Sequence, residues 1–284
     1  MESNRQMKKA FSMLELVFVN VILGIVSSIG AEVIANVYGS YILQRATHRS
    51  SIKTELAATQ LANRLAYSIP DTVIGRKSSG YRAIDDLDDN DYTILEWMSY
   101  DNDSFSAQTT PGWSGFVDLN ASSSTVLKSN GSDIDKTATI IQNLGGNDIT
   151  DASLFFPEEY TVDTIGYNGD TSDTIPVLSN TADTFTVNDL SGRTIKEHYK
   201  LSWTAYALVP SDNGDGTFDL ELYYNYQPWL GESYSDGLHH LLAKDVSVFK
   251  FVGSQNTIRF KLCQQEKISK TDKITICKEK AVIR

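Results

Sequence analysis

The feature that most constrains this chain is an apolar run of 21 residues, 11–31, which follows a short basic N-terminus. A helix rises about 1.5 Å per residue, so about 20 residues span the roughly 30 Å hydrocarbon core of a bilayer. The run is therefore long enough to cross a membrane once. Its flank carries Arg5, Lys8 and Lys9 against Glu2, which predicts a cytoplasmic N-terminus and an extracytoplasmic remainder.

An ordinary signal peptide or a plain anchor is the simplest interpretation of this run, and two observations oppose it. A signal peptide has its small-residue cleavage site after the apolar run, whereas here the junction Lys9-Ala10-Phe11 before the run resembles a processing point. A plain anchor gains nothing from Glu15, since a carboxylate costs at least about 2.5 kcal/mol at the centre of a membrane helix and less near its end. These two points alone leave both interpretations open.

The junction and the run together resemble the N-terminus of type IV prepilins and of the pseudopilins of type II secretion. In that family a basic leader and a small residue precede a motif close to F-T-L-I-E and a hydrophobic helix, and Phe11-Ser12-Met13-Leu14-Glu15 matches it position by position. The resemblance is specific over residues 8–31. It implies cleavage between Ala10 and Phe11 by a membrane prepilin peptidase, N-methylation at Phe11, and assembly into a helical filament.

The resemblance also implies a role for the charge inside the apolar run. Glu15 would be an assembly residue that meets the N-terminal amine of a neighbouring subunit, which supplies the opposite charge a buried carboxylate requires. Two positions depart from the family pattern. Ala10 replaces the usual Gly before the cut, which leaves the efficiency of processing open. Asn20 replaces an aliphatic residue in mid-membrane, either as an interhelical contact or as a tolerated polar residue.

Beyond the membrane segment, apolar residues continue mostly at three-to-five-residue spacing, which is typical of an amphipathic helix. These residues are Val33, Val37, Tyr41, Ile52, Leu56, Leu61, Leu65 and Ile69. Pro70 should stop the helix. We therefore expect an α+β fold in which one long N-terminal helix, membrane-spanning over 11–31 and amphipathic over 32–69, packs on a large antiparallel β-rich domain over 70–284. The resemblance implies that this domain is pilin-like.

The first part of that domain, residues 70–198, predicts short strands joined by long loops, because it is rich in Ser, Thr, Asn, Asp and Gly. Short apolar pieces occur at 93–98 and 152–156. Two features have alternative interpretations. The sequence 118–122 satisfies an N-glycosylation sequon at Asn120, a pattern that also occurs by chance. An acidic cluster is either a calcium site or a solvated turn, and comprises Asp85, Asp86, Asp88, Asp89 and Asp91.

The second part, residues 199–284, gives a clearer β signal. Residues 199–209 and 218–226 alternate apolar with polar side chains, which predicts two half-buried strands of an antiparallel sheet. In their connector a calcium loop would use Asn213, Asp215 and Asp219, but the bidentate acid that such a loop needs is missing. A glycine-rich hairpin turn explains the connector with fewer assumptions. We therefore expect a turn and no required cofactor, with calcium as the alternative.

The last predicted strands, 246–252, 257–264 and 273–277, carry the two cysteines of the chain. Cys263 and Cys277 lie symmetrically about a turn at 269–272 and on the same face of their strands, so their sulfurs should be close enough to bond. Two cysteines outside the cytoplasm favour a disulfide over a metal site or a redox motif.

Composition and motifs exclude several function classes. The formal charge is -11, and removal of residues 1–10 takes away three basic residues and one acidic residue, giving -13. Such an acidic surface repels nucleic acid, so we expect no nucleic-acid partner. No catalytic or nucleotide-binding motif is present, and the histidines, His48, His198, His239 and His240, form no ligand pattern. We expect a chain that is not an enzyme, but itself a substrate of a prepilin peptidase and N-methyltransferase.

Three functions follow as hypotheses. The first is a structural subunit of a filament, a minor pseudopilin of a type II secretion system or a minor type IV pilin. Size and strand content favour the J class of minor pseudopilins. Its partners would be other pilins through the N-terminal helix, the prepilin peptidase and inner-membrane lipid, with the body in the bacterial periplasm. The second is a signal-anchored periplasmic domain that binds glycan or protein, and the third is an anchored hydrolase. Only the first uses Phe11 and Glu15 together.

Overall fold

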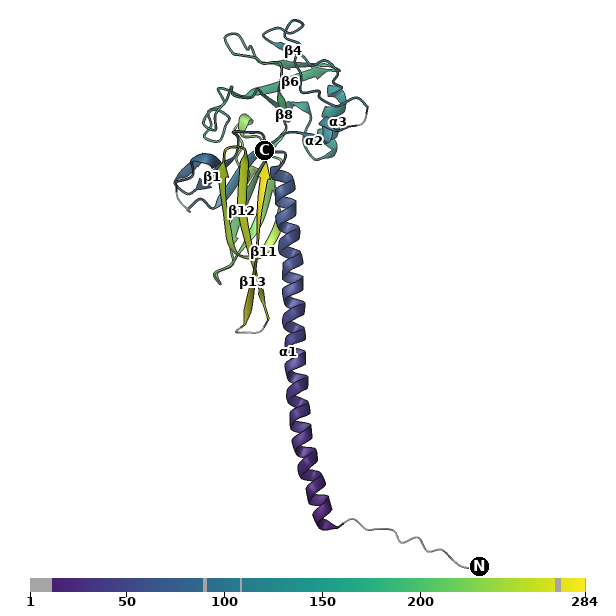
Figure 1. Ribbon diagram of the computed structural model, residues 1–284. Helices are drawn as coiled ribbons and strands as arrows, with labels where there is room; N and C mark the ends of the chain where they lie inside the picture. Colours follow the sequence, from purple (N-terminus) through teal and green to yellow (C-terminus); the bar gives the residue numbers. More distant parts are fainter. Residues whose placement is uncertain (1–11, 89–90, 108, 269–271, 284) are drawn as a thin grey trace, which may run out of the picture.

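The computed structural model describes residues 12–88, 91–107, 109–268 and 272–283, and consists of one long helix and a β-rich body (Figure 1). Helix α1, Met13–Leu65, has 53 residues and is therefore about 80 Å long. Only its C-terminal part lies against the body. The expected combination of a long N-terminal helix with a large antiparallel β-rich domain is confirmed.

Helix α1 begins with a capping box. The Ser12 side chain accepts a hydrogen bond from the Glu15 amide at 3.3 Å, and the Glu15 carboxylate accepts one from the Ser12 amide at 3.1 Å. This reciprocal pair satisfies two of the amide groups that a helix N-terminus leaves without intrahelical partners. Glu15 is therefore a helix-starting residue in the isolated chain.

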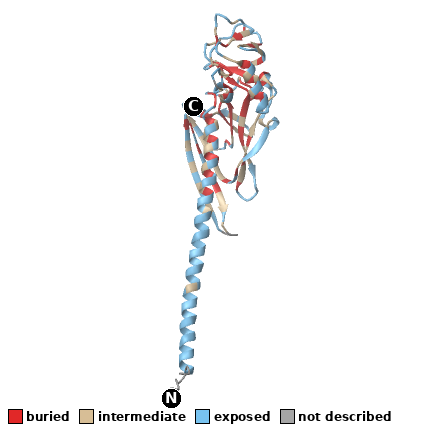
Figure 2. Cartoon of the chain, turned by 90° about the vertical axis from the view of Figure 1, so that its right-hand side faces the viewer, coloured by how far each residue is buried: buried red, intermediate tan, exposed pale blue. Residues whose placement is uncertain are grey.

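The face of α1 that packs on the body agrees with the apolar spacing at Leu61 and Leu65, which are buried, but not at two earlier positions. Ile52 and Leu56, which we expected to belong to the packed face, are 55% and 58% exposed. Figure 2 shows the exposed helix and the short stretch where burial begins. The buried residues are mostly small and comprise Ser50, Thr54, Ala57, Ala58, Leu61 and Leu65. Small side chains let the helix backbone approach the bulky side chains of the sheet, so they form the contact.

The helix also ends earlier than expected. It stops at Leu65, with Ala66 as the C-cap, and not at Ile69. The Ser68 hydroxyl donates to the Leu65 carbonyl at 2.7 Å, and the Ile69 amide donates to the Met98 carbonyl at 2.8 Å. These bonds satisfy the helix end and hold Ser68 in an isolated bridge with Ser99, so the chain leaves the helix before Pro70.

The body contains two antiparallel sheets (Figure 1). The larger sheet has the strand order β13-β12-β11-β10-β9-β3-β1-β2. Its strands are β1 (Ile74–Lys77), β2 (Gly80–Ala83), β3 (Ile94–Ser99), β9 (Thr204–Asp212), β10 (Phe218–Tyr224), β11 (Leu238–Ser254), β12 (Thr257–Lys267) and β13 (Lys273–Ile283). Helix α1 lies against β11, β12 and β13 of this sheet.

The smaller sheet lies above the larger one and has the order β4-β7-β6-β5-β8. Its strands are β4 (Val126–Lys128), β5 (Ser153–Phe155), β6 (Ile175–Thr181), β7 (Thr184–Val187) and β8 (Lys200–Ser202). The helices and turns of the body are η1 (Ile84–Asp86), α2 (Asn102–Phe105), α3 (Ile134–Asn143), η2 (Ile149–Asp151), η3 (Pro228–Leu230) and η4 (Tyr234–Asp236).

The chain passes from the larger to the smaller sheet between β3 and β4, and returns between β8 and β9. Only Trp203 separates β8, which pairs with β5 in the smaller sheet, from β9, which pairs with β3 and β10 in the larger. The alternating pattern over 199–209 predicted this strand correctly, but not its division between two sheets. The predicted short strands at 93–98 and 152–156 correspond to β3 and β5, whereas α3 and the smaller sheet as a unit were not predicted.

Three clusters of buried side chains stabilise the body. The first lies between α1 and the larger sheet and includes Leu61, Leu65 and Trp97. The second consists of buried side chains from the smaller sheet, α3 and the loops next to them. The third lies beyond the other face of β3 and includes Met98 and Tyr226. Strand β3 is thus buried on both faces, because Leu95 and Trp97 belong to the first cluster and Met98 to the third.

The predicted disulfide between Cys263 and Cys277 is confirmed. The two residues are direct partners in the register of β12 and β13, and their Cα atoms are 4.0 Å apart. Both strands extend past the predicted ends, with β13 continuing to Ile283. The disulfide therefore lies inside a long hairpin whose β13 strand also contacts α1.

Replacing both cysteines by serine should lower the free energy of unfolding by about 3 kcal/mol, the chain-entropy value for a loop of about 15 residues. Denaturant unfolding of the full chain in detergent would measure this difference. Reductant should destabilise the native chain and leave the double variant unchanged. Two free thiols in unreduced native protein, seen by mass spectrometry, would contradict the prediction.

Candidate functional site

The processing and assembly residues lie at the free end of α1. Ala10 and Phe11 are outside the described residues, so the expected cleavage and methylation positions have no structural description. Glu15 is in the first turn of the helix and is exposed, apart from its capping contact with Ser12. Among the described residues, α1 is the one helix long and apolar enough to cross a membrane.

One side of α1, outside its buried contact, carries exposed apolar residues, and we call it the outer helix face. It has two groups, Ile34, Tyr38 and Tyr41, and then Ile52 and Leu56, all more than half exposed, with the exposed Arg45 and Arg49 between the groups. Tyr38 and Leu56 are 18 residues apart, about five turns at 3.6 residues per turn, so they lie on one line along the helix. The outer helix face begins where the predicted membrane segment ends, and it continues beside the body.

Asn20 belongs to the same line, because it precedes Tyr38 by 18 residues, again about five turns. Its side chain is exposed on the helix surface. The amide therefore points in the same direction as the outer helix face. An interhelical contact for Asn20 remains a prediction.

The hairpin that joins β9 to β10 uses its acidic groups in protein hydrogen bonds. Asp215 accepts from the Thr217 hydroxyl at 2.6 Å and from the Lys267 ammonium at 2.7 Å. These contacts, with that of Lys267 first, lower the pKa of Asp215. Asp219 accepts from the Asn213 amide at 3.0 Å and from the backbone of Asp245 at 3.0 Å. The candidate calcium residues are thus hydrogen-bonded to protein groups within an exposed hairpin turn.

The acidic cluster near residue 88 also contacts protein groups. Asp88 lies 3.4 Å from the Arg82 guanidinium and accepts a hydrogen bond from the Tyr92 hydroxyl at 3.0 Å. Asp85 and Asp86 are in the short turn η1, while Asp89 is outside the described residues. Within the described chain, no group of three or more His, Cys, Asp and Glu side chains is arranged to hold a metal ion.

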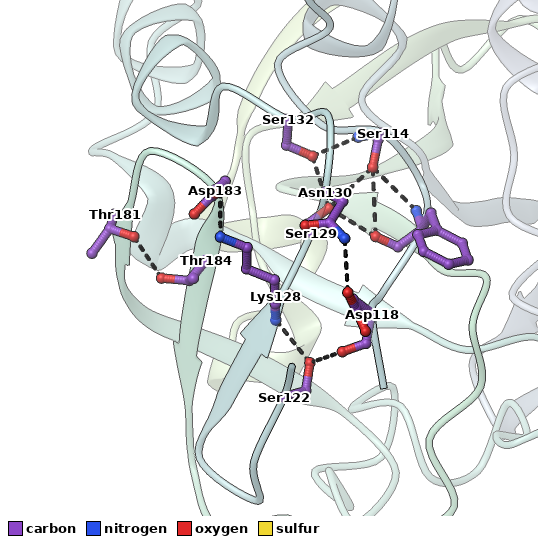
Figure 3. Close-up of polar contacts among 11 residues, drawn as sticks. Ser114, Asp118, Ser122, Lys128, Ser129, Asn130, Ser132, Thr181, Asp183 and Thr184 are labelled. Atoms are coloured by element: carbon purple, nitrogen blue, oxygen red, sulfur yellow. Dashed lines mark hydrogen bonds and ion pairs between the residues drawn. The ribbon is translucent and has the colours of Figure 1, made fainter. Parts of the chain in front are cut away.

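The sequon forms a closed turn at the edge of the smaller sheet (Figure 3). The Ser122 hydroxyl donates to the Asp118 carbonyl at 2.6 Å and accepts from the Lys128 amide at 2.9 Å. Asp118 accepts from the backbone of Asn120 at 3.1 Å and from the Asn130 side chain at 2.8 Å. The side chains of Asp118 and Ser122 therefore have a structural role in the turn, whereas Asn120 is exposed.

A buried ion pair is the most unusual polar group of the body. The Arg76 guanidinium donates to the Glu96 carboxylate at 2.8 Å, and the Tyr226 hydroxyl donates to its other oxygen at 3.0 Å. The Glu96 side chain is 1% exposed. Burial raises the pKa of Glu96, while the charge and hydrogen bonds of Arg76 act in the opposite direction. Because both oxygens of Glu96 have hydrogen-bond partners, we interpret this ion pair as part of the folded core.

A second buried carboxylate lies at the junction of the two sheets. One oxygen of Asp101 caps α2 by accepting from the Ser104 amide at 3.1 Å. The other oxygen, Oδ2, is buried and has no hydrogen-bond partner among the described residues. Burial raises the pKa of Asp101 to about 6. Asp101 lines a cavity of about 440 Å³, the junction cavity, between the end of α1, the start of β9 and β11.

Sequence reasoning did not identify Glu96 or Asp101 as buried carboxylates. For Glu96 a signal existed, because residues 94–99 read I-L-E-W-M-S, with apolar side chains on both faces of the strand. A charge in such a strand is buried and needs a partner. For Asp101 no local signal exists, because the junction cavity is formed by residues from four distant parts of the chain.

No protein-family model, no curated protein and no solved structure matches this chain.

Proposed function

We propose that this chain is a structural subunit of a type IV pilin-like filament, most similar in kind to a minor pseudopilin of a type II secretion system. The observation that carries the proposal is the outer helix face. Helix α1 buries one face against the larger sheet from Ser50 to Leu65 and leaves the two apolar groups of the outer helix face exposed. Apolar side chains grouped on one side of a helix favour packing against another element.

Lipid does not account for the whole of this surface. If residues 11–31 span the bilayer, Leu56 is 25 residues further along, about 37 Å beyond the membrane segment at 1.5 Å per residue. A group of exposed apolar side chains that far from lipid favours a protein partner over a lipid one. The helices of neighbouring subunits, aligned along a filament, would supply a partner of matching length and chemistry.

The motif at the free end supports the same proposal. Glu15 now bonds to the Ser12 amide of its own chain. In a filament the N-terminal amine of a neighbouring Phe11 would offer the carboxylate a full positive charge, which in lipid is a stronger partner than a neutral amide. Among minor subunits the J class remains our preference, on size and on the strand-rich body.

We considered two alternative functions, one closely related to the proposal and one that competes with it. A minor type IV pilin would use the same outer helix face and the same Glu15. A signal-anchored periplasmic binding domain would use α1 as a tether only, and the junction cavity is the observation in its favour. Measuring how far Glu15 variants are incorporated into filaments distinguishes a helix that assembles into a filament from one that only tethers the domain.

Replacing Glu15 by alanine should reduce incorporation into filaments roughly tenfold or more, because loss of a charged contact worth more than about 1.4 kcal/mol changes an equilibrium by that factor. Glu32→Ala is the matched control, since Glu32 is an exposed acidic residue of the same helix. Cross-linking of full-length chains in cells, followed by fractionation of sheared filaments, measures incorporation. Equal incorporation of the two variants would refute the proposal.

N-terminal sequencing of the protein from membranes is the direct test of processing. The proposal requires a start at methylated Phe11. A start at Met1, or downstream of residue 31, would show that residues 1–31 are not a prepilin-type segment.

A further inference from the structure

We propose that Glu32 of one chain forms an ion pair with Arg45 of a second copy, so that parallel α1 helices pack with an axial offset of 13 residues, about 20 Å. This inference rests on the proposed function and deepens it, because it names a contact that fixes the axial position of neighbouring subunits. The neighbour is a different one from that which would meet Glu15, since a helical filament surrounds each subunit with several others.

Glu32 and Arg45 are charges that have no partner in a single chain. Both side chains are exposed, and neither forms an ion pair, a side-chain hydrogen bond or a ring contact within the described residues. The same is true of Arg49. By contrast, Glu55, the next acidic residue of α1, lies 3.3 Å from the Lys278 ammonium of β13. The charges of Glu32 and Arg45 are therefore available to another molecule.

The spacing of the two arginines also favours an acidic partner. Arg45 and Arg49 are four residues apart and so are neighbours on the helix surface, where like charges are destabilising. No acidic residue lies three or four positions from either of them. A carboxylate from another chain would offset the repulsion and accept a charge-assisted hydrogen bond from a guanidinium. The two arginines are thus less costly in an assembly than in an isolated chain.

The acid and the base lie on different sides of α1. At 3.6 residues per turn, their separation of 13 residues places Glu32 and Arg45 about 140° apart around the helix axis. Glu32 precedes the buried Ser50 by 18 residues, about five turns, so it lies on the side that packs on the body, in the exposed stretch before the body begins (Figure 2). Each helix can therefore offer its arginine to one copy and its glutamate to another. A contact between two different surfaces repeats from copy to copy along an open filament.

The charges select one offset between the helices. Every copy enters the membrane in the same orientation, so neighbouring α1 helices are parallel. An offset of 13 residues places Arg45 of the chain nearer the cytoplasm beside Glu32 of the other chain, and Arg49 beside the amide of Asn36. An offset of 17 residues would pair Arg49 with Glu32, but it would place Arg45 beside Ser28 of the predicted membrane segment, where a cation is unfavourable.

The same offset matches the apolar residues of the two surfaces. It places Ile52 of the chain nearer the cytoplasm opposite Gly39 of the other chain, and Leu56 opposite Leu43. Apart from the adjoining helix backbone, no part of the chain lies within 4 Å of the position that a Cβ of Gly39 would occupy, so another helix can approach closely there. Ile52, Leu56 and Leu43 are 55%, 58% and 47% exposed. Their burial between two copies would stabilise the contact.

Cross-linking between full-length chains that each carry one introduced cysteine measures the offset. The native cysteines are bonded to each other and do not take part. In cells that assemble the filament, Ile52→Cys of one chain should cross-link to Gly39→Cys of another. Ala35→Cys and Ala46→Cys are the matched controls, because they lie on the same side of α1 as Gly39 but before and after it, and should cross-link more weakly.

Charge reversal tests the ion pair itself. Arg45→Glu in the Ile52→Cys chain, or Glu32→Arg in the Gly39→Cys chain, should each lower the cross-linked yield roughly fivefold, as expected for loss of one exposed ion pair. The two reversals together place opposite charges across the contact again and should recover most of the yield. Circular dichroism of the purified chains confirms that each variant is folded.

The effect of this contact on incorporation is smaller than that of Glu15. Glu32→Ala removes one exposed ion pair and should lower incorporation no more than about fivefold. The loss of tenfold or more expected for Glu15→Ala therefore stays distinguishable from it.

Three results would overturn the inference. The first is a cross-link from Ile52→Cys that is as strong to Ala35→Cys or Ala46→Cys as to Gly39→Cys. The second is a single charge reversal that leaves the yield unchanged, and the third is a double reversal that does not recover it. A cross-link at another offset leaves the filament proposal standing, whereas absence of every cross-link between chains contradicts both.

Discussion

Replacing Arg76 by methionine should lower the free energy of unfolding by about 3–5 kcal/mol, because it leaves the buried carboxylate of Glu96 without its counter-charge. The remaining Tyr226 hydroxyl, at 3.0 Å, satisfies one oxygen but supplies no charge. Denaturant unfolding of the full chain in detergent at pH 7 measures the loss. Arg82→Met is the matched control, since the Arg82–Asp88 pair is about half exposed and should contribute at most about 1 kcal/mol.

The same variant should regain stability on acidification. Burial already raises the pKa of Glu96, and loss of Arg76 removes an interaction that opposes this rise. A carboxyl whose pKa is higher in the folded than in the unfolded state binds more protons when folded, so stability increases as the pH falls through the folded pKa. The deficit of Arg76→Met relative to the native chain should therefore shrink between pH 7 and about pH 5. A deficit no larger than that of Arg82→Met, or one that grows on acidification, would contradict this explanation.

Replacing Leu61 by alanine should lower the free energy of unfolding by about 2–5 kcal/mol, the range for a leucine removed from a packed core. Leu61 is fully buried between α1 and the larger sheet, in the same cluster as Trp97. The loss weakens the attachment of the helix to the body. Thermal and denaturant unfolding of the full chain would measure it.

Leu56→Ala is the matched control for this prediction. It makes the same substitution in the same helix five positions earlier, where the side chain is 58% exposed, and should change stability by no more than about 0.5 kcal/mol. If the chain is a filament subunit as proposed, Leu56→Ala should instead reduce filament incorporation, because Leu56 belongs to the outer helix face. Equal stability losses for Leu61→Ala and Leu56→Ala would show that α1 does not pack on the larger sheet through the face that contains Leu61.

Helix α1 was predictable from the sequence because its pattern is long and continuous, but its packed face was predicted only in part, at Leu61 and Leu65. The apolar positions Ile52 and Leu56 suggested one face, whereas Ala57 and Ala58 form part of the real contact. Periodicity marks apolar residues, and it does not distinguish the side that packs on the same chain from the side left for another molecule. The apolar pattern of α1 therefore combined residues of the packed face with residues of the outer helix face.

In the β-rich body too, features with a local sequence pattern were predictable, and features formed by distant residues were not. Alternation predicted the strand over 199–209, and two cysteines placed symmetrically about a turn predicted the disulfide. Strands of three residues, such as β5 and β8, are too short to show a period. The junction cavity joins residues from Gln60 to Leu242, so no stretch of sequence contains its pattern.

The single residue between β8 and β9, Trp203, has a consequence for motion within the body. A molecule built from two sheets usually bends between them, but here β8 and β9 are one strand with a single residue between its two ladders. The Asp101 amide donates to the Leu201 carbonyl at 2.8 Å, and the Gln227 side chain donates to the Trp203 carbonyl at 2.9 Å. A hinge at this point would break both bonds. We therefore expect the two halves to move together, so that any molecule entering between them meets walls of fixed spacing.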